Sequence, residues 1–206
     1  MFRLRFGVVV LFVFCIAVAP LHAQAQSQAQ QAPTAQPPAA QAPAPQTPAA
    51  PPAAKPADVA SPDAILAATY DVISGTAGQK RDWDRFRSLF LPGARLIPSG
   101  PKREGAGYGA RPFTPDDYAE RAAPFFEKEG FFEKEAARKS ERYGNIMQVF
   151  STYESRHDAK DAEPFARGIN SFQLFFDGTR WWVVTIFWQQ ESPDTPLPKE
   201  FLPAAH

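Results

Sequence analysis

The fold is decided by two segments near the C-terminus, which read ARGINSFQLFF at 166–176 and RWWVVTIFWQ at 180–189. Asp177-Gly178 between them is a hairpin signal, because a tight turn between strands favours residues that tolerate a positive φ. The second segment is apolar on both faces, so a strand there must be covered on both sides. The pair therefore predicts two long antiparallel strands within a packed sheet.

Two more strands are expected before this hairpin. Residues Ile146–Arg156 are rich in β-branched and aromatic side chains, and Gly144-Asn145 before them supplies a turn. The segment Gly130–Tyr143 contains strong helix formers in EKEAAR at 133–138, so its local propensity favours a helix. We predict a strand there instead, because a run of antiparallel hairpins needs a neighbour at this edge.

Three helices are predicted on the N-terminal side of these strands. The tripeptide SPD at 61–63 combines an N-cap hydroxyl, a proline at the first helical position and a carboxylate near the positive end of the dipole. It predicts a helix over about 62–74, and a second helix fits Trp83–Phe90. A third begins at Thr114 with the same pattern of cap, proline and acid, and Pro124 is expected to kink or stop it.

A short strand at 94–97 and a glycine-rich loop at 98–112 are expected between the second and third helices. The predicted order is therefore helix, helix, strand, helix and then three or four long antiparallel strands. This order defines the α+β class, with a curved antiparallel sheet wrapped around about three N-terminal helices to form a cone-shaped α+β barrel.

Both ends of the chain differ in composition from this domain, which is expected to span 59–191. Residues 1–23 have the layout of a secretory signal peptide, with two arginines ahead of an apolar run that is too short to cross a bilayer as a helix. Residues 24–58, rich in Gln, Ala and Pro, predict a disordered linker, and 192–206 a C-terminal tail. We expect a periplasmic or secreted protein with no stable membrane anchor after cleavage, and anchoring by an uncleaved N-terminal segment is the alternative.

Charge and cysteine content narrow the range of partners and cofactors. The chain has 22 basic and 22 acidic residues, so no surface for nucleic acid is expected. Cys15 is the only cysteine and falls within the predicted signal peptide, which excludes disulfides and cysteine-ligated metals from the mature chain. Asp158, Asp161 and Glu163 share a loop with His157, but their spacing matches no metal motif. We expect no cofactor and no metal.

The order of elements and three motifs resemble the nuclear transport factor 2-like superfamily, whose cone fold is shared by ketosteroid isomerases and SnoaL-like proteins. The motifs are Tyr70 on the first helix, WDRFRSLF at 83–90 followed by PGARL at 92–96, and DGTRWW at 177–182 leading the last strand. Together with the predicted signal peptide, the resemblance implies an exported member of this group. It implies a fold rather than an activity, since such domains include enzymes, binding proteins and interaction modules.

The catalytic residues of the enzyme relatives do not transfer to this chain. Ketosteroid isomerases carry an aspartate base at the end of the first strand, where this chain has Pro98 and Ser99, although Tyr70 falls near the position of their hydrogen-bonding tyrosine. A dehydratase-like site needs a buried histidine, and His157 and His206 lie in a polar loop and in the tail. No catalytic residue is therefore assigned.

Candidate pocket residues follow from the expected pairing of the two strands on either side of the polar loop. If Arg156 lies opposite Gly168, then Glu154 faces Asn170, and the period of two puts these side chains on one face. A carboxylate, a guanidinium and an amide in an aromatic-walled cavity would orient a small, polar-tipped ligand. The full set of candidates is Tyr70, Glu154, Arg156, Asn170, Phe172 and Trp188. As alternatives, Glu154 and Arg156 form an ordinary surface pair, and the aromatic side chains belong to the core or to a dimer contact.

We expect a non-catalytic domain that binds a small, partly apolar ligand or a protein partner and forms a homodimer. The competing hypothesis is an isomerase, dehydratase or cyclase that uses Glu154 as base and Tyr70 as hydrogen-bond donor. A third hypothesis is a purely structural dimerisation domain without an internal cavity.

Overall fold

The computed structural model describes residues 50–203. The predicted signal peptide, residues 24–49 of the predicted linker and the last three residues of the chain lie outside this range, so export of the chain stays a prediction. Within the range, no helix has both the length and the apolar character that a membrane crossing requires.

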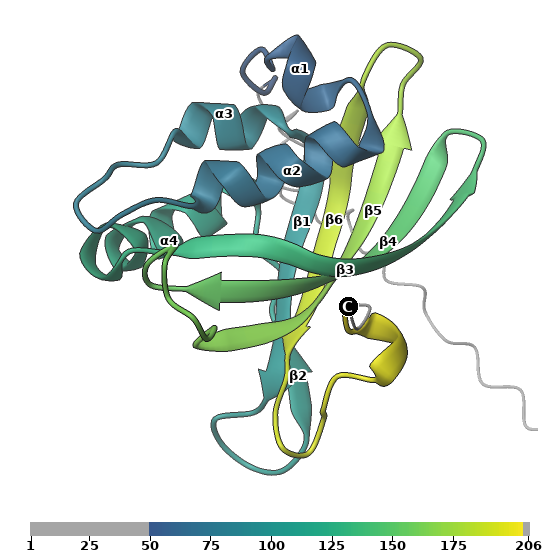
Figure 1. Cartoon of the computed structure of the whole chain (residues 1–206). Helices are drawn as coiled ribbons and strands as arrows, with labels where there is room; N and C mark the ends of the chain where they lie inside the picture. The colour runs from purple at the N-terminus through teal and green to yellow at the C-terminus, as the bar shows by residue number, and fades with distance from the viewer. Residues whose placement is uncertain (1–49, 204–206) are drawn as a thin grey trace, which may run out of the picture. The chain divides into compact units, whose positions relative to one another are not determined.

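A six-stranded sheet runs through the described domain in the order β2-β1-β6-β5-β4-β3 (Figure 1). All neighbouring strands are antiparallel except β1 and β6, which are parallel. The four long strands expected in the C-terminal half are confirmed to within two residues at each end. The strands are β1 (Phe90–Pro101), β2 (Tyr108–Ala110), β3 (Phe132–Tyr143), β4 (Ile146–Arg156), β5 (Ala166–Phe176) and β6 (Trp181–Gln190).

Strand β3 forms although its sequence favours a helix. It pairs with β4 from Phe132↔Arg156 to Tyr143↔Ile146, with a bulge between Glu135 and Ala137. Helix propensities differ by at most about 0.7 kcal/mol between ordinary residues. Pairing along the whole edge of β4 outweighs that difference, so the predicted strand is confirmed.

The helices begin at the predicted caps and gather on one face of the curved sheet (Figure 1). Ser61 Oγ accepts a hydrogen bond from the backbone of Ala64 at 3.1 Å, and Thr114 forms a capping box with Asp117. A 3-10 turn near the C-terminus lies against the other face of the sheet. The helices are α1 (Pro56–Val59), α2 (Pro62–Ile73), α3 (Trp83–Ser88) and α4 (Pro115–Glu129), and the turn is η1 (Lys199–Phe201).

Two predictions between α3 and β3 differ from the structure in part. Pro124 does not stop the helix, because α4 continues to Glu129 and Tyr118 and Phe126 on either side of the proline both pack against the core. Strand β1 runs past the predicted short strand and pairs with β2, so much of the expected glycine-rich loop is a hairpin. Its turn contains Gly105 and Gly107, both at positive φ.

The domain extends further at both ends than the sequence predicts. Helix α1 lies within the predicted linker, where Asp58 accepts a hydrogen bond at 2.7 Å from Arg85, and this bond lowers the pKa of the Asp58 carboxyl. Within the predicted tail, the carbonyl of Phe201 accepts a hydrogen bond at 2.6 Å from Thr152 on β4. These contacts anchor both segments to the sheet and its helices.

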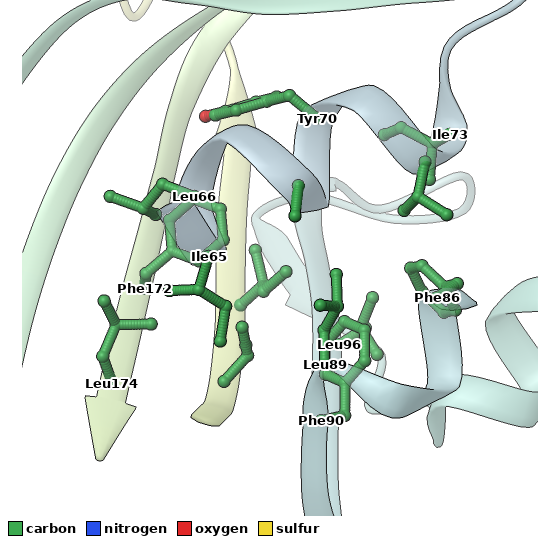
Figure 2. Packing of buried hydrophobic residues seen from close by; sticks show 14 of the residues in the cluster. Ile65, Leu66, Tyr70, Ile73, Phe86, Leu89, Phe90, Leu96, Phe172 and Leu174 are labelled. Atoms are coloured by element: carbon green, nitrogen blue, oxygen red, sulfur yellow. The ribbon is translucent and has the colours of Figure 1, made fainter. Parts of the chain in front are cut away.

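The core lies between α2 and the inner face of the sheet. Figure 2 shows Ile65, Leu66 and Tyr70 of α2 pointing toward Phe172 and Leu174 of β5. Residues Phe86, Leu89, Phe90 and Leu96 from α3 and the start of β1 complete the same cluster. The only cysteine of the chain lies in the predicted signal peptide, so no disulfide stabilises the domain. Hydrophobic packing of this kind therefore supplies most of the favourable free energy of folding.

Strand β6 is buried on one face only, which differs from the sequence prediction. Trp181, Val183 and Ile186 are buried on the inner face, whereas Phe187 on the outer face is 44% exposed. Neither η1 nor the rest of the described C-terminal segment buries this side chain. Homodimer formation stays a prediction.

Arg81 ties the end of α2 to the end of α4. Its buried guanidinium donates to the carbonyls of Ile73 at 2.9 Å, Gly75 at 2.6 Å and Phe126 at 3.3 Å. Gly75 in turn exchanges two backbone hydrogen bonds with Phe131, at 2.7 and 2.9 Å. A Cβ on Gly75 would lie 2.8 Å from Arg81 Nη1, so a larger residue there would displace the guanidinium from its hydrogen bonds.

Replacing Arg81 with Met should lower the free energy of unfolding by about 2 kcal/mol or more, because the carbonyls of Ile73 and Phe126 lose this donor and each buried carbonyl left without a donor costs ~1–3 kcal/mol. The carbonyl of Gly75 keeps the N–H of Phe131. Arg95→Met is the matched control, because exposed Arg95 bonds only the neighbouring carbonyls of Gly93 and Ala94. The control should change stability by less than about 0.5 kcal/mol. Denaturant unfolding measures both variants, and equal losses would contradict the role given to Arg81.

Candidate functional site

The pairing of β4 with β5 differs from the predicted register. Glu154 lies opposite Arg167, three residues from the predicted partner Asn170. Because side chains alternate between the two faces, this odd shift puts Glu154 and Asn170 on opposite faces of the sheet. The apolar pattern sets the register, since Val149 and Phe172 lie opposite each other and are both buried on the inner face.

Glu154 and Arg156 lie on the outer face and form an ion pair. Arg156 Nη2 is 2.9 Å from Glu154 Oε2, and Lys134 Nζ is 3.6 Å from the same oxygen. The Arg156 Nε donates to the carbonyl of Asp161 at 2.9 Å. The predicted convergence of these two residues with Asn170 is therefore wrong. The alternative of a pair between Glu154 and Arg156 is met, although both side chains are largely buried rather than on the surface.

The other four candidates line a single cavity of about 220 Å³ on the inner face of the sheet. Tyr70 reaches it from α2, Asn170 and Phe172 from β5, and Trp188 from β6. Nine of its 18 lining residues are aromatic, so the cavity is largely apolar. The aromatic residues are Tyr70, Phe86, Tyr118, Phe126, Phe131, Tyr153, Phe165, Phe172 and Trp188.

Glu133 on β3 is the one charged side chain among the described residues that line the cavity. Its carboxylate accepts hydrogen bonds from Ser155 Oγ at 2.8 Å and from Asn170 Nδ2 at 3.4 Å. Both donors line the same cavity, so the carboxylate faces into it. Burial raises the pKa of Glu133 to about 7, although both hydrogen bonds act in the opposite direction.

The sequence analysis missed Glu133. The residue stands in a run of alternating charges, Glu133-Lys134-Glu135, that identifies neither face of a strand. The sequence does place Glu133 near the start of a predicted strand. A side chain at that position faces either the solvent or the interior, and the sequence alone does not say which. Only the pairing of Glu133 with Ser155, which is buried, decides between the two.

A chain of hydrogen bonds connects the cavity to the protein surface. Asn170 Nδ2 donates to Tyr70 Oη at 3.2 Å, Tyr70 Oη lies 2.6 Å from Ser151 Oγ, and Ser151 donates to Glu135 at 2.5 Å. Since the single hydroxyl proton of Ser151 goes to Glu135, Tyr70 donates its own proton to Ser151. Glu135 in turn pairs with Arg138 at 2.6 Å.

Tyr70 is therefore held as an acceptor toward the cavity, not as the hydrogen-bond donor that the sequence analysis expected. Burial and the nearby charge of Glu133 raise the pKa of Tyr70, Tyr118 and Tyr153 above the usual range, so all three phenols are neutral. The described residues give the hydroxyls of Tyr118 and Tyr153 no hydrogen-bond partner. These two hydroxyls are the ones available to a ligand.

His157 lies beside the cavity without lining it. Its ring stacks on Phe165 with the centroids 4.1 Å apart, and Phe165 lines the cavity. Within residues 50–203, no group of His, Cys, Asp and Glu side chains is arranged to hold a metal ion. The glycine-rich segment at 105–109 belongs to the β1–β2 hairpin and contributes nothing to the cavity wall.

The fold and the cavity together define an α+β domain with a curved sheet around its helices and a polar cluster inside. No family model matches the chain, and no curated protein matches it. Solved structures to which it is similar include a nuclear transport factor 2 superfamily protein of Salmonella enterica serovar Typhimurium LT2, with 17% identity, 66% of this chain and 85% of that chain covered, and a TM-score of 0.41.

Two further similar structures are nuclear transport factor 2-like proteins of unknown function. The one from Shewanella baltica OS155 has 14% identity, covers 62% of this chain and 89% of its own, and has a TM-score of 0.41. The one from Methylobacillus flagellatus KT has 12% identity, covers 64% and 95%, and has a TM-score of 0.39. The predicted α+β fold is confirmed, and the similarity concerns the fold alone.

Glu133 should make the stability of the protein depend on pH. Its pKa of about 7 in the folded protein exceeds the ordinary 4.5, so the folded state binds the proton more tightly than the unfolded chain does. The stabilisation is complete below pH ~4.5 and is lost as the pH rises to ~7, a change of roughly 3 kcal/mol at about 1.4 kcal/mol per pKa unit.

Unfolding of the natural protein and of Glu133→Gln in denaturant, from pH 4 to 8, measures this contribution as the difference between the two curves. The contributions of all other groups cancel in that difference. Parallel curves would show that the carboxyl is not buried in the folded state.

Proposed function

We propose that the domain binds a small, mostly apolar ligand in the cavity between α2 and the inner face of the sheet. The observation that supports this function is an aromatic cavity of about 220 Å³ with one polar cluster at Glu133, Asn170 and Tyr70. Ligand sites combine hydrophobic walls with a few placed polar groups in this way. The volume equals about seven water molecules at ~30 Å³ each, which suits a ligand slightly larger than benzene.

Blocking the cavity should abolish this binding. Ala166 lies on the inner face at the start of β5 and lines the cavity, so Ala166→Trp fills space that the ligand needs. Benzyl alcohol, a neutral probe of suitable size, should bind the natural protein with a dissociation constant of about 1 mM or below, and Ala166→Trp at least tenfold more weakly.

Chemical-shift titration measures this binding, and the shifts should map to residues around the cavity. Ala162→Trp is the control, because Ala162 is exposed in the loop between β4 and β5 and does not line the cavity. The absence of benzyl alcohol binding to the natural protein, or equal binding to the blocked variant, would contradict the proposed site.

Proton transfer is a second candidate function, and the pKa of Glu133, about 7, favours it because an acid–base group works best near the pH of its surroundings. This is the chemistry of an isomerase, dehydratase or cyclase. Glu154, the base named in the sequence analysis, is paired with Arg156 on the outer face. Glu133 takes its place in this hypothesis, and the hydroxyls of Tyr118 or Tyr153 replace Tyr70 as hydrogen-bond donors.

Exchange of the α-hydrogens of cyclohexanone, a ketone that fits the cavity volume, for deuterium tests this second function without a known substrate. The natural protein should accelerate the exchange, with a rate that rises as Glu133 ionises near pH 7. Glu133→Gln should lose ~10²–10⁴-fold of the acceleration, and Glu154→Gln should lose none. Exchange at the uncatalysed rate with the natural protein would leave ligand binding as the function.

A further inference from the structure

Above pH ~7, where Glu133 is ionised, the cavity contains a negative charge that no positive charge among its described lining residues balances. Glu133 is held by two neutral donors, Ser155 and Asn170, and no Lys, Arg or His lines the cavity within residues 50–203. Three basic side chains, Lys134, Arg138 and Arg156, line an adjacent pocket that also touches Glu133, but none of them pairs with it. Lys134 and Arg156 pair with Glu154, and Arg138 pairs with Glu135 and Asp63.

A buried carboxylate without a counter-charge discriminates strongly among ligands according to their charge. An anionic ligand would add a second negative charge to the same apolar volume, which is costly in a region of low dielectric. A neutral ligand would leave the carboxylate as it is. A cationic ligand would supply the missing charge and gain a charge-assisted hydrogen bond.

The aromatic wall favours the same kind of ligand. The faces of Trp, Tyr and Phe rings attract cations through their negative quadrupole, most strongly where water is excluded. Tyr118 and Trp188 meet edge to face with centroids 6.2 Å apart, and Phe126 stacks on Phe131 at 4.3 Å. These four rings and the carboxylate of Glu133 line one cavity.

Hydrogen-bond acceptors for an ammonium group lie in the same cavity. A primary ammonium has three N–H donors and no acceptor. Glu133 supplies a carboxylate, and the hydroxyl oxygens of Tyr118 and Tyr153 have no partner among the described residues. Tyr70 is occupied by Asn170 and Ser151 and serves as a fixed wall.

We propose that the cavity binds a small organic cation, a protonated amine on a hydrocarbon group of fewer than about ten non-hydrogen atoms, with its nitrogen against Glu133. This inference rests on the proposed ligand-binding function and narrows it to one class of ligand. The upper size follows from the cavity volume of about 220 Å³, because a cavity of ~150 Å³ holds benzene.

Three probes with the same ring separate charge from shape: benzylamine, benzyl alcohol and benzoate. Isothermal titration of the natural protein at pH 8 should give at least tenfold tighter binding for benzylamine than for benzyl alcohol, and no binding of benzoate. Equal binding of benzylamine and benzyl alcohol, or tighter binding of benzoate, would overturn the cation inference and leave the ligand cavity in place. No binding of any probe would overturn both.

The variant Glu133→Gln tests whether the Glu133 carboxylate causes the preference for a cationic ligand. It should reduce benzylamine binding at least tenfold more than it reduces benzyl alcohol binding, whereas Glu154→Gln should change neither. Unchanged benzylamine binding in Glu133→Gln would overturn the inference. Because this variant removes a buried charge, it should remain folded, and its thermal unfolding provides the check.

The pH dependence of benzylamine affinity is an independent test of the role of Glu133. The other titratable groups that line the cavity are Tyr70 from α2, Tyr118 from α4 and Tyr153 from β4, and all three are neutral below pH 9 because their pKa values are raised. Outside the cavity, Glu133 also borders Lys134, Glu135, Arg138 and Arg156 in the adjacent pocket, where each of these four side chains is held in an ion pair. Glu133 alone therefore changes charge in the cavity between pH 5 and 8. Benzylamine affinity should rise at least tenfold over this range and benzyl alcohol affinity should not, and a flat benzylamine profile would contradict the role of Glu133.

Discussion

Val149 on β4 and Phe172 on β5 lie opposite each other on the inner face of the sheet, and both are almost completely buried. This apolar pair fixes the register of the two strands, because a shift by one residue would turn every side chain of β4 to the other face. The register in turn brings Ser151 and Ser155 inside and leaves Glu154 outside. The polar cluster of the cavity is therefore a consequence of how the hydrophobic core packs.

The sequence was a good guide to the elements and a poor one to the site. Strong local signals placed the cap at Ser61, the turn at Gly144 and the ends of β4 and β5, since these depend on neighbouring residues alone. Register depends on contacts between distant residues, so the predicted partner of Glu154 was wrong by three positions. Tyr70, Asn170, Phe172 and Trp188 were predicted to share a pocket and do line one cavity.

The charge of Glu133 is a cost to the folded protein that the structure does not offset with a cation. An apolar residue or a glutamine at this position would avoid the expense of desolvating a carboxylate. Ser155 and Asn170 reduce this cost without removing it, which is why the pKa of Glu133 stays near 7. A group kept in an unfavourable state within a cavity is characteristic of sites whose chemistry is directed at a ligand.

The close contact between Gly75 and Arg81 restricts how this protein can diverge in sequence. Any side chain at position 75 collides with the guanidinium, and any shorter residue at position 81 abandons the carbonyls of Ile73 and Phe126. Each change alone is expected to destabilise the fold, so a replacement at one position favours a matching replacement at the other. In an alignment of descendants of this chain, the two columns would be expected to covary, and the contact between the ends of α2 and α4 would be retained longer than the residues that line the cavity.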